Sequence, residues 1–302
     1  MAYTTGDTIL DDHYNDFATS VNAIWGTGSG DSGYGETSTV SAVSAGTTVT
    51  ATQWTTLLSR ISSMASHQGS SITSITNPSA GNTISAYTAL STNIATITTN
   101  RLNVAARQAI VNGTASTTTN LTGTITQTGK FTFSSEAQAR YFFNQGGRFT
   151  ITWSLTGFTA NLKATNWGTL VNSEAGSYII NAQTSGKSGG SGTATTNNTN
   201  LGWHDLTGSY QVAFKQFFDS GGYAAYTSNF IQLEIYKSGA EVFWKTTWQD
   251  DAAEQTGFNK SIYNILDNVD GNKITTFGHE RPSTTYTSAT YGTITLTTTA
   301  NG

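Results

Sequence analysis

The segment Phe230-Ile-Gln-Leu-Glu-Ile-Tyr236 places Ile or Leu at every second position, and the turn Lys237-Ser-Gly239 separates it from Val242-Phe-Trp244. Successive side chains of a strand point to opposite faces, so this pattern gives the strand one aliphatic face. A short turn that contains Gly joins two such strands as an antiparallel hairpin. The stretch therefore predicts antiparallel β structure in the second half of the chain.

The same period of two recurs along the chain after Gly113. Thr and aromatic residues fill these segments, and both are favoured on a half-buried pleated surface. Asp270-Gly271 adds a further hairpin signal. Many short strands between turns predict an antiparallel β-sandwich with a jelly-roll-like arrangement. The other predicted strands are residues 121–126, 131–133, 149–153, 178–180 and 291–296.

The first third of the chain has a helical period instead. Apolar residues at spacings of three and four form one stripe on a first predicted helix, which Thr8 and Asp11 open in the manner of a capping box. A second predicted helix starts after Thr50, with Gln53 in capping-box register, and ends near Gln68-Gly69. The stripe of the first helix consists of Leu10, Tyr14, Phe17, Val21, Ile24 and Trp25.

A third helix is predicted at residues 85–109. Thr and Asn fill much of it and are poor helix formers, so it should depend on packing against neighbours. Short helical insertions are predicted at residues 135–146 and 210–218, and the Gly/Ser/Thr/Asn-rich residues 185–200 are predicted to form a loop. The apolar stripe of the third helix consists of Tyr87, Leu90, Ile94 and Ile97.

The change of period divides the chain into two predicted domains. Residues 1–112 are expected to form a small helical domain for docking or oligomerisation, and residues 113–302 a β-sandwich domain. The predicted fold class is therefore α+β and multidomain, with the helical domain first and an antiparallel, jelly-roll-like sandwich second.

The composition is unusually poor in charge. Only 11% of the residues are charged, against about a quarter in an ordinary soluble domain, while Thr is the most frequent residue and aromatic residues make up 11%. Free monomers usually stay soluble through mixed surface charge. A chain that lacks this charge but keeps its aromatic residues suits a surface that packs against other copies or other chains.

Charge and cysteine content exclude several classes of function. The net charge of −4 provides no basic face for nucleic acid. The absence of Cys removes thiolate nucleophiles and Cys-ligated metals. No apolar run approaches the roughly 20 residues that span a bilayer, so no membrane insertion is expected. The absence of Cys fits folding in the cytoplasm, and the start of the chain shows no basic and apolar segments of a signal peptide.

No motif in the chain predicts a cofactor, a metal or a catalytic set. Gly28-Ser-Gly-Asp-Ser-Gly33 fits the G-x-G-x-x-G pattern, but it follows a helix, whereas a dinucleotide site needs it after a strand. The four His residues have no ligand spacing. Asp250-Asp251 is better explained as a solvated turn than as part of a glycosidase pair, which would need two carboxylates across a cleft.

Three Trp residues are weak candidates for stacking on sugar rings. An exposed aromatic row would bind sugars in that way, but Trp is highly buried on average, so core packing is the preferred interpretation. Burial of these side chains would count against glycan binding. The candidates are Trp203, Trp244 and Trp248.

Several stretches resemble virion structural proteins of tailed phages, most closely those of cyanobacterial and marine phages. Residues 12–35 carry the resemblance at the N-terminus, and His67-Gln68-Gly69 and Asn100-Arg101-Leu102-Asn103 continue it. Residues 139–147 and 205–211 extend it into the second half. The resemblance implies a place in the virion and supplies no catalytic residues.

These observations together predict a non-enzymatic virion component of the tail, the baseplate or an appendage. It is expected to bind copies of itself, with a homotrimer favoured by analogy to phage fibres, and to bind other virion proteins. The two helical stripes, residues 10–25 and 87–97, are the candidate assembly interface. The alternatives are a capsid decoration protein, an adhesin module that binds host surface glycan, and a glycan-cleaving enzyme.

Overall fold

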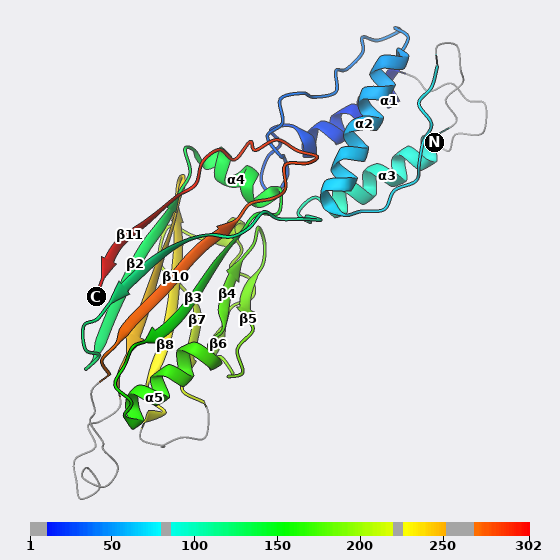
Figure 1. The fold of residues 1–302 in the computed structure, drawn as a ribbon. Coiled ribbons are helices and arrows are strands. Elements are labelled where there is room, and N and C mark those ends of the chain that lie inside the picture. Colours follow the sequence, from blue (N-terminus) through cyan, green and yellow to red (C-terminus); the bar gives the residue numbers. More distant parts are fainter. Residues whose placement is uncertain (1–10, 80–85, 220–225, 252–268) are drawn as a thin grey trace, which may run out of the picture. The chain divides into compact units, whose positions relative to one another are not determined.

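The computed structural model describes residues 11–79, 86–219, 226–251 and 269–302 (Figure 1). The chain divides into two compact units. The first comprises Met1–Gln108, Ala137–Gly147 and Arg281–Gly292, and the second comprises Ala109–Glu136, Arg148–Glu280 and Thr293–Gly302. Leu10 and the predicted capping residue Thr8 lie outside the described residues.

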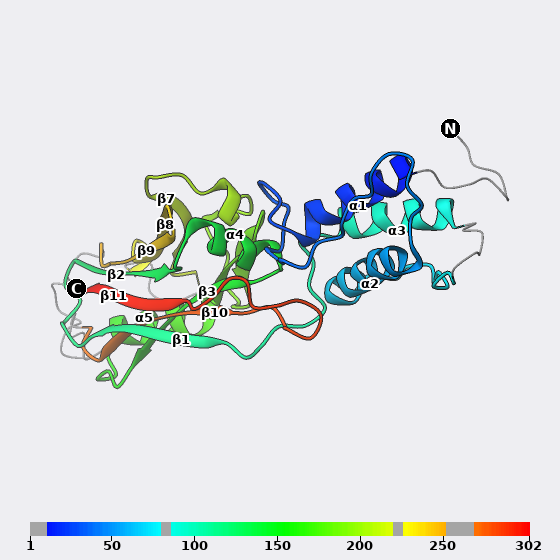
Figure 2. The same cartoon turned by 90° about the horizontal axis from the view of Figure 1, so that it is seen from above.

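The first unit is built around three helices, α1 (Asp11–Trp25), α2 (Ala51–Gln68) and α3 (Tyr87–Thr99), which pack against one another (Figure 2). The predicted ends of α2 are confirmed. The Thr50 side chain accepts a bond from the Gln53 backbone N–H while the Gln53 side chain accepts from the Thr50 N–H, and Gly69 closes the helix with φ 70°. These local signals act within one turn of helix, which is why sequence could predict them.

The third helix is shorter than predicted. It ends at Thr99 and does not continue to residue 109, because the chain turns at Asn100. The Arg101 carbonyl accepts a hydrogen bond from the Tyr34 hydroxyl at 2.8 Å, and the Arg101 guanidinium forms an ion pair with Asp31. Long-range contacts of this kind override the helical period beyond residue 100.

Two segments distant in sequence complete the first unit. One contains α4 (Glu136–Asn144), which confirms the predicted helical insertion at residues 135–146, and the other is Arg281–Gly292. The predicted domain boundary at residue 112 therefore differs from the observed division. The first stretch of the helical unit ends at Gln108, and the unit takes two further pieces from the region expected to be sandwich.

The second unit contains two antiparallel sheets. The five-stranded sheet has the order β1-β10-β3-β4-β5 and the six-stranded sheet the order β11-β2-β9-β8-β7-β6. In the first sheet the strands are β1 (Val111–Thr117), β10 (Asn272–Glu280), β3 (Arg148–Thr156), β4 (Ser177–Ile180) and β5 (Ser185–Ser188). In the second they are β11 (Thr295–Asn301), β2 (Thr124–Thr132), β9 (Glu241–Gln249), β8 (Phe230–Ser238), β7 (Gln211–Phe217) and β6 (Thr196–Asn197).

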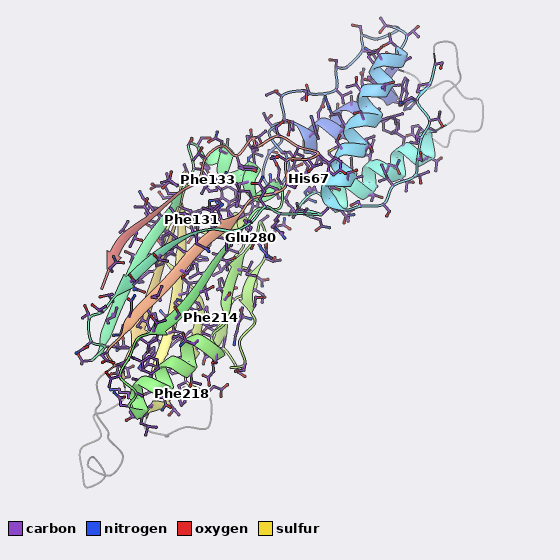
Figure 3. All side chains as sticks on the ribbon, viewed as in Figure 1. His67, Phe131, Phe133, Phe214, Phe218 and Glu280 are labelled. Carbon is purple, nitrogen blue, oxygen red and sulfur yellow. The ribbon has the colours of Figure 1, made fainter. Side chains whose placement is uncertain are left out.

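Aromatic side chains join the inner faces of the two sheets. Phe131 of β2 stacks on Phe149 of β3 with ring centroids 3.7 Å apart, and Trp153 of β3 stacks on Phe214 of β7 at 5.0 Å. Figure 3 shows Phe131 and Phe214 at separate places along this interior. The sheets therefore form one β-sandwich core, as the sequence predicted, within an α+β fold.

The hairpin predicted from residues 230–244 is confirmed, with β8 paired to β9 across Gly239 at φ 53°. Two other predictions in this unit are wrong. Within the predicted helix of residues 210–218, Gln211–Phe217 form strand β7, because this segment pairs with β8. Residues 185–200 contain β5 and β6 and are not simply a loop.

Five further elements were not predicted. Strand β1 pairs along its whole length with β10, and helix α5 (Leu162–Thr169) runs into a π-helical turn, η1 (Leu170–Glu174). A 3-10 turn, η2 (Trp203–Asp205), follows β6. Asp270-Gly271 precedes β10, whose partners are β1 and β3, so in the described residues it does not join two paired neighbours.

Candidate binding surface

Several acidic side chains of the sandwich are each paired with one cation. Glu234 forms an ion pair with Lys245 at 2.7 Å, Glu241 with Lys130 at 2.5 Å, and Asp250 with Lys163 at 2.6 Å. In the described ranges, no three His, Asp or Glu side chains gather as a metal site would require. Among the same residues, no helix is long and apolar enough to cross a membrane.

The four His residues lie in separate environments. His67 and His279 are buried, His13 contacts the ring of Tyr87, and His204 lies against Trp203. The carboxylate next to His279 in sequence, Glu280, pairs instead with Arg148 at 2.8 Å. This placement agrees with the expectation that adjacent strand residues point to opposite faces.

A buried hydrogen-bond network joins the pieces of the helical unit. The Gln145 side chain donates to the Tyr34 carbonyl at 2.7 Å and to the Thr290 hydroxyl at 2.6 Å, and it accepts from the Thr287 hydroxyl at 3.1 Å. The Gln68 side chain donates to the Tyr34 hydroxyl at 3.0 Å. Three stretches of sequence thus depend on one another for buried partners, which makes the network a structural element of this unit.

The Gly-rich loop of residues 26–35 is held by the same unit. Arg140 of α4 donates to the carbonyls of Thr27 and Ser32 at 2.6 and 2.7 Å, and Asn144 donates to that of Gly33 at 3.2 Å. Gly33 has φ 98°, and a Cβ there would lie 2.3 Å from the Thr27 carbonyl oxygen. The G-x-G-x-x-G pattern therefore serves a tight turn whose carbonyls are bound by side chains.

His67 is the titratable group at the centre of this network. One ring nitrogen, Nε2, lies 2.9 Å from the Gln145 carbonyl oxygen and donates to it, and Nδ1 lies 3.4 Å from the Thr287 hydroxyl. Burial lowers the pKa of His67 below its usual 6.5, opposed in part by the bond to Gln145. The imidazole is therefore neutral in the folded unit at neutral pH.

Acidification is expected to destabilise the helical unit through His67. The unfolded chain takes up a proton near pH 6.5 and the folded chain only at lower pH, so this contribution to stability is complete above pH 6.5 and is lost as the pH falls through the folded pKa. Thermal melting at pH 7 and pH 5 measures it. His67→Gln should lower the melting temperature at pH 7 but show a smaller difference between the two pH values; an equal difference in both proteins would contradict this assignment.

The candidate assembly residues fill the core of the helical unit. Tyr14, Phe17, Val21, Ile24 and Trp25 of α1 are buried, as are Leu90, Ile94 and Ile97 of α3. Tyr87 is half-buried against Phe17 with ring centroids 5.2 Å apart, and Leu10 lies outside the described residues. These side chains pack within the chain, so a contact between copies has to use other residues.

The three candidate glycan-stacking residues are also buried. Trp244 packs against Phe277 in the sandwich interior, Trp248 donates its indole N–H to Gln127 at 3.0 Å, and Trp203 is covered by the Lys237 ammonium 4.2 Å from its ring centroid. No ring face of these three is open to a sugar. Their burial counts against glycan binding through Trp.

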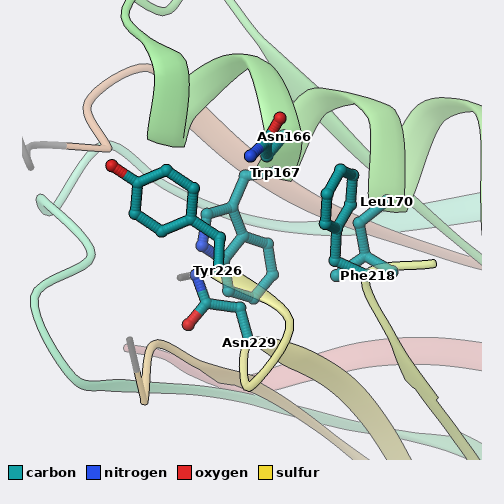
Figure 4. A pocket seen from close by; sticks show the side chains of 6 residues that line it. All are labelled: Asn166, Trp167, Leu170, Phe218, Tyr226 and Asn229. Atoms are coloured by element: carbon teal, nitrogen blue, oxygen red, sulfur yellow. The ribbon is translucent and has the colours of Figure 1, made fainter. Parts of the chain in front are cut away.

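A small pocket lies beside α5 (Figure 4). In this view the Trp167 ring is placed between Tyr226 and Phe218. All the lining side chains are buried, and the space between them does not admit a sphere of the size of water. The pocket is therefore a packing irregularity and not a ligand site. Its lining residues are Asn166, Trp167, Leu170, Phe218, Tyr226 and Asn229.

The outer face of the six-stranded sheet carries aromatic and charged side chains at positions that alternate with the buried ones. They are half-buried, and Tyr210 and Val212 are each 39% exposed. We call this set the aromatic face. It consists of Tyr210, Val212, Phe217, Phe230, Tyr236 and Phe243, together with Lys130, Lys215, Glu234, Glu241 and Lys245.

Part of the aromatic face is a continuous stack across neighbouring strands. Tyr236 and Phe243 are directly paired in register and lie parallel, with ring centroids 4.4 Å apart. Tyr210 meets Tyr236 edge-to-face at 4.6 Å. Lys130 lies 5.6 Å from the Phe243 centroid and Lys245 lies 4.6 Å from that of Tyr210. The faces of these rings contact one another or a Lys ammonium, so this stack offers no open ring face to a sugar.

A second aromatic cluster occupies the other end of this face. Phe217 and Phe230 are paired in register with ring centroids 5.2 Å apart, and the Lys215 ammonium lies 3.6 Å from the Phe230 centroid. The Glu234–Lys245 pair lies in register between the two clusters. This arrangement of apolar rings around paired charges is suited to contact with another protein surface.

The aromatic face was not predicted, although the sequence carried its signal. In the quoted stretch at residues 230–236, Phe230 and Tyr236 occupy the same parity as Gln232 and Glu234, which is the side opposite the buried Ile and Leu residues. Aromatic residues at the outward parity are unusual for a solvated face.

Protein-family models, curated proteins and solved structures yield no match to this chain.

Proposed function

We propose that this chain is a non-enzymatic structural component of a tailed-phage virion, placed in the tail, the baseplate or an appendage. It is synthesised and assembled in the host cytoplasm and acts by binding copies of itself, with a homotrimer favoured, and other virion proteins. We also propose that the strands of the sandwich are connected in a jelly-roll-like order.

The observation that supports this proposal is the aromatic face. Ordinary solvated sheet faces carry scattered charge, whereas this one presents two aromatic clusters around neutralised ion pairs. Interfaces between proteins are enriched in aromatic side chains in this way. The resemblance to virion proteins gives the same class of function. Among the residues that carry it, Gln68 and Gln145 belong to the buried network, and Arg101 and Arg140 bind the Gly-rich loop of residues 26–35.

Two alternatives remain, one within the assembly class and one outside it. A capsid decoration protein would use the same face on the head lattice. A host-glycan adhesin would need open ring faces, and the candidate Trp residues and the Tyr236–Phe243 stack do not offer them. These burials and ring contacts count against the adhesin alternative.

The oligomeric part of the proposal is tested by the mass of the wild-type chain in solution. Low charge gives copies little mutual repulsion, so self-association at micromolar concentration is expected. Multi-angle light scattering should give three times the chain mass of 32.0 kDa. A closed oligomer of another size would contradict only the prediction of a trimer. A monomer at every concentration tested would contradict self-association itself.

A further inference from the structure

We propose that the aromatic face is the surface through which one copy of this chain packs against a second copy. This inference rests on the proposed function, because it names the surface that carries the self-association. It places the contact on the sandwich and not on the helical stripes, whose side chains are buried within the chain.

The face provides more than half of the area that a standard stable contact needs. Strands β2, β8 and β9 each contain nine residues, which at a rise of ~3.4 Å per residue gives a length of about 30 Å. The four neighbouring strands that carry the face, β7, β8, β9 and β2, are spaced ~4.8 Å apart and give a width of roughly 15–20 Å. The resulting area of about 450–600 Å² is more than half of the roughly 800 Å² that each partner buries in a standard specific interface.

The charges on the face are complementary to those of another copy. Lys130 and Glu241 on one strand pair, and Lys245 and Glu234 on the next, present both signs side by side. Their side chains remain between 16% and 29% exposed, so they can also interact with opposite charges across a contact. A strongly basic or acidic partner would be attracted to only one half of each pair, whereas a second copy carries the matching pattern.

The aromatic side chains supply the apolar part of such a contact. Tyr210 and Val212 are the exposed apolar residues of the face, and they lie beside Glu234, which is in register with Val212. Phe217 and Phe230 form the second apolar cluster. Aromatic residues dominate binding energy where they are desolvated at the centre of an interface.

The outer face of the five-stranded sheet differs and serves as an internal control. Its strands align a row of hydroxyl side chains, and the Thr152 hydroxyl donates to Ser177 at 3.0 Å. The described strands place no aromatic side chain on that face. The hydroxyl row consists of Thr114, Thr276, Thr152, Ser177 and Ser188, in register across all five strands.

A lysine placed at Val212 tests the proposal. Val212→Lys adds an ammonium where Lys245 already neutralises Glu234, so close approach of a second copy must bury an unmatched charge. The dissociation constant for self-association should rise about 10- to 100-fold by light scattering over a concentration series. Ile274→Lys, an apolar-to-lysine change at a half-buried outward position of β10, is the matched control and should leave the constant within about threefold.

Thiol labelling keeps the proposal testable if the Lys variant folds poorly. The chain has no Cys, so a single introduced Cys reports only its own position. Thr247 lies on β9 between the two aromatic clusters. In Thr247→Cys, maleimide labelling should be at least about fivefold slower above the self-association concentration than well below it. Thr276→Cys on β10 is the control and should be labelled at the same rate at both concentrations. Equal rates for Thr247→Cys, or an oligomer unchanged by Val212→Lys, would overturn this surface while leaving the proposed function standing. A monomeric wild-type chain would overturn both.

Discussion

A fragment that ends at residue 112 is expected to lack a cooperative melting transition. It contains α1, α2 and α3 but loses α4 and Arg281–Gly292, which belong to the same compact unit. Without these segments, His67 and Tyr34 lose their contacts with Gln145, and the carbonyls of the Gly-rich loop lose those with Arg140. Each buried polar group left without a partner costs about 1–3 kcal/mol, and a domain is stable by only about 5–15 kcal/mol.

Circular dichroism at 222 nm during heating measures this transition. The full chain is the control and should melt cooperatively, whereas the fragment should lose its helical signal gradually. A graded version uses Gln145→Ala in the full chain, which should lower the free energy of unfolding by about 3–5 kcal/mol. Glu136→Ala, at the exposed start of the helix α4 that Gln145 follows, should change it by less than about 0.5 kcal/mol. A sharp transition in the fragment would show that the three helices fold without the insertions.

The second large effect is expected from the buried ion pair in the sandwich. The side chains of Lys163 on α5 and Asp250 after β9 are only 3% and 2% exposed, with Nζ 2.6 Å from Oδ2. Lys163→Met keeps the apolar length of the side chain but leaves the Asp250 carboxylate buried without its cation. Removing one partner of such a pair typically costs about 3–5 kcal/mol.

Urea unfolding of single and double variants isolates this pair. Lys163→Met combined with Asp250→Leu should be more stable than Lys163→Met alone, because the double variant buries no unpaired charge. Arg148→Ala, which removes a pair whose Arg side chain is 30% exposed, should cost about 1 kcal/mol or less. A loss below 1 kcal/mol for Lys163→Met would mean that the carboxylate finds water or another partner.

Local signals explain which parts of the fold could be predicted. The capping box of Thr50 and Gln53 and the hairpin at Gly239 involve residues within a few positions of each other, and both are present. The end of α3 and the composition of the helical unit depend on Arg101–Asp31 and Gln145–Tyr34 contacts that are 70 and 111 residues apart in sequence. No local pattern carries that information.

Strand β10 shows why some strands were missed. Its inward positions include Lys273 and Thr275, which a simple alternation of apolar and polar residues assigns to solvent. The Lys273 ammonium donates to the carbonyls of Thr119, Asp270 and Gly271 at 2.9–3.0 Å, and the Thr275 hydroxyl donates to Gln127 at 2.6 Å. Because these groups are satisfied internally, the polar side chains occupy the core and the expected pattern disappears.

The same reasoning applies to the candidate site. Apolar periodicity identified the side chains of α1 and α3 correctly as buried, but sequence alone does not tell whether a buried stripe faces its own chain or another. The strands that carry the aromatic face also have apolar side chains at their inner positions, so apolar character alone does not distinguish the two faces. It became recognisable only when the register placed Tyr236, Phe243 and Tyr210 side by side on one surface.

The most direct test of the proposed virion role is a reconstruction, by electron cryomicroscopy at a resolution that resolves strands, of the phage particle in which the proposal places this chain. We expect several copies of this chain in the tail, baseplate or an appendage, related by closed symmetry, with the aromatic face of each copy, centred on Tyr236 and Phe243, against another copy. Particles without density for this chain, or copies that occupy isolated positions with that face in solvent, would contradict it.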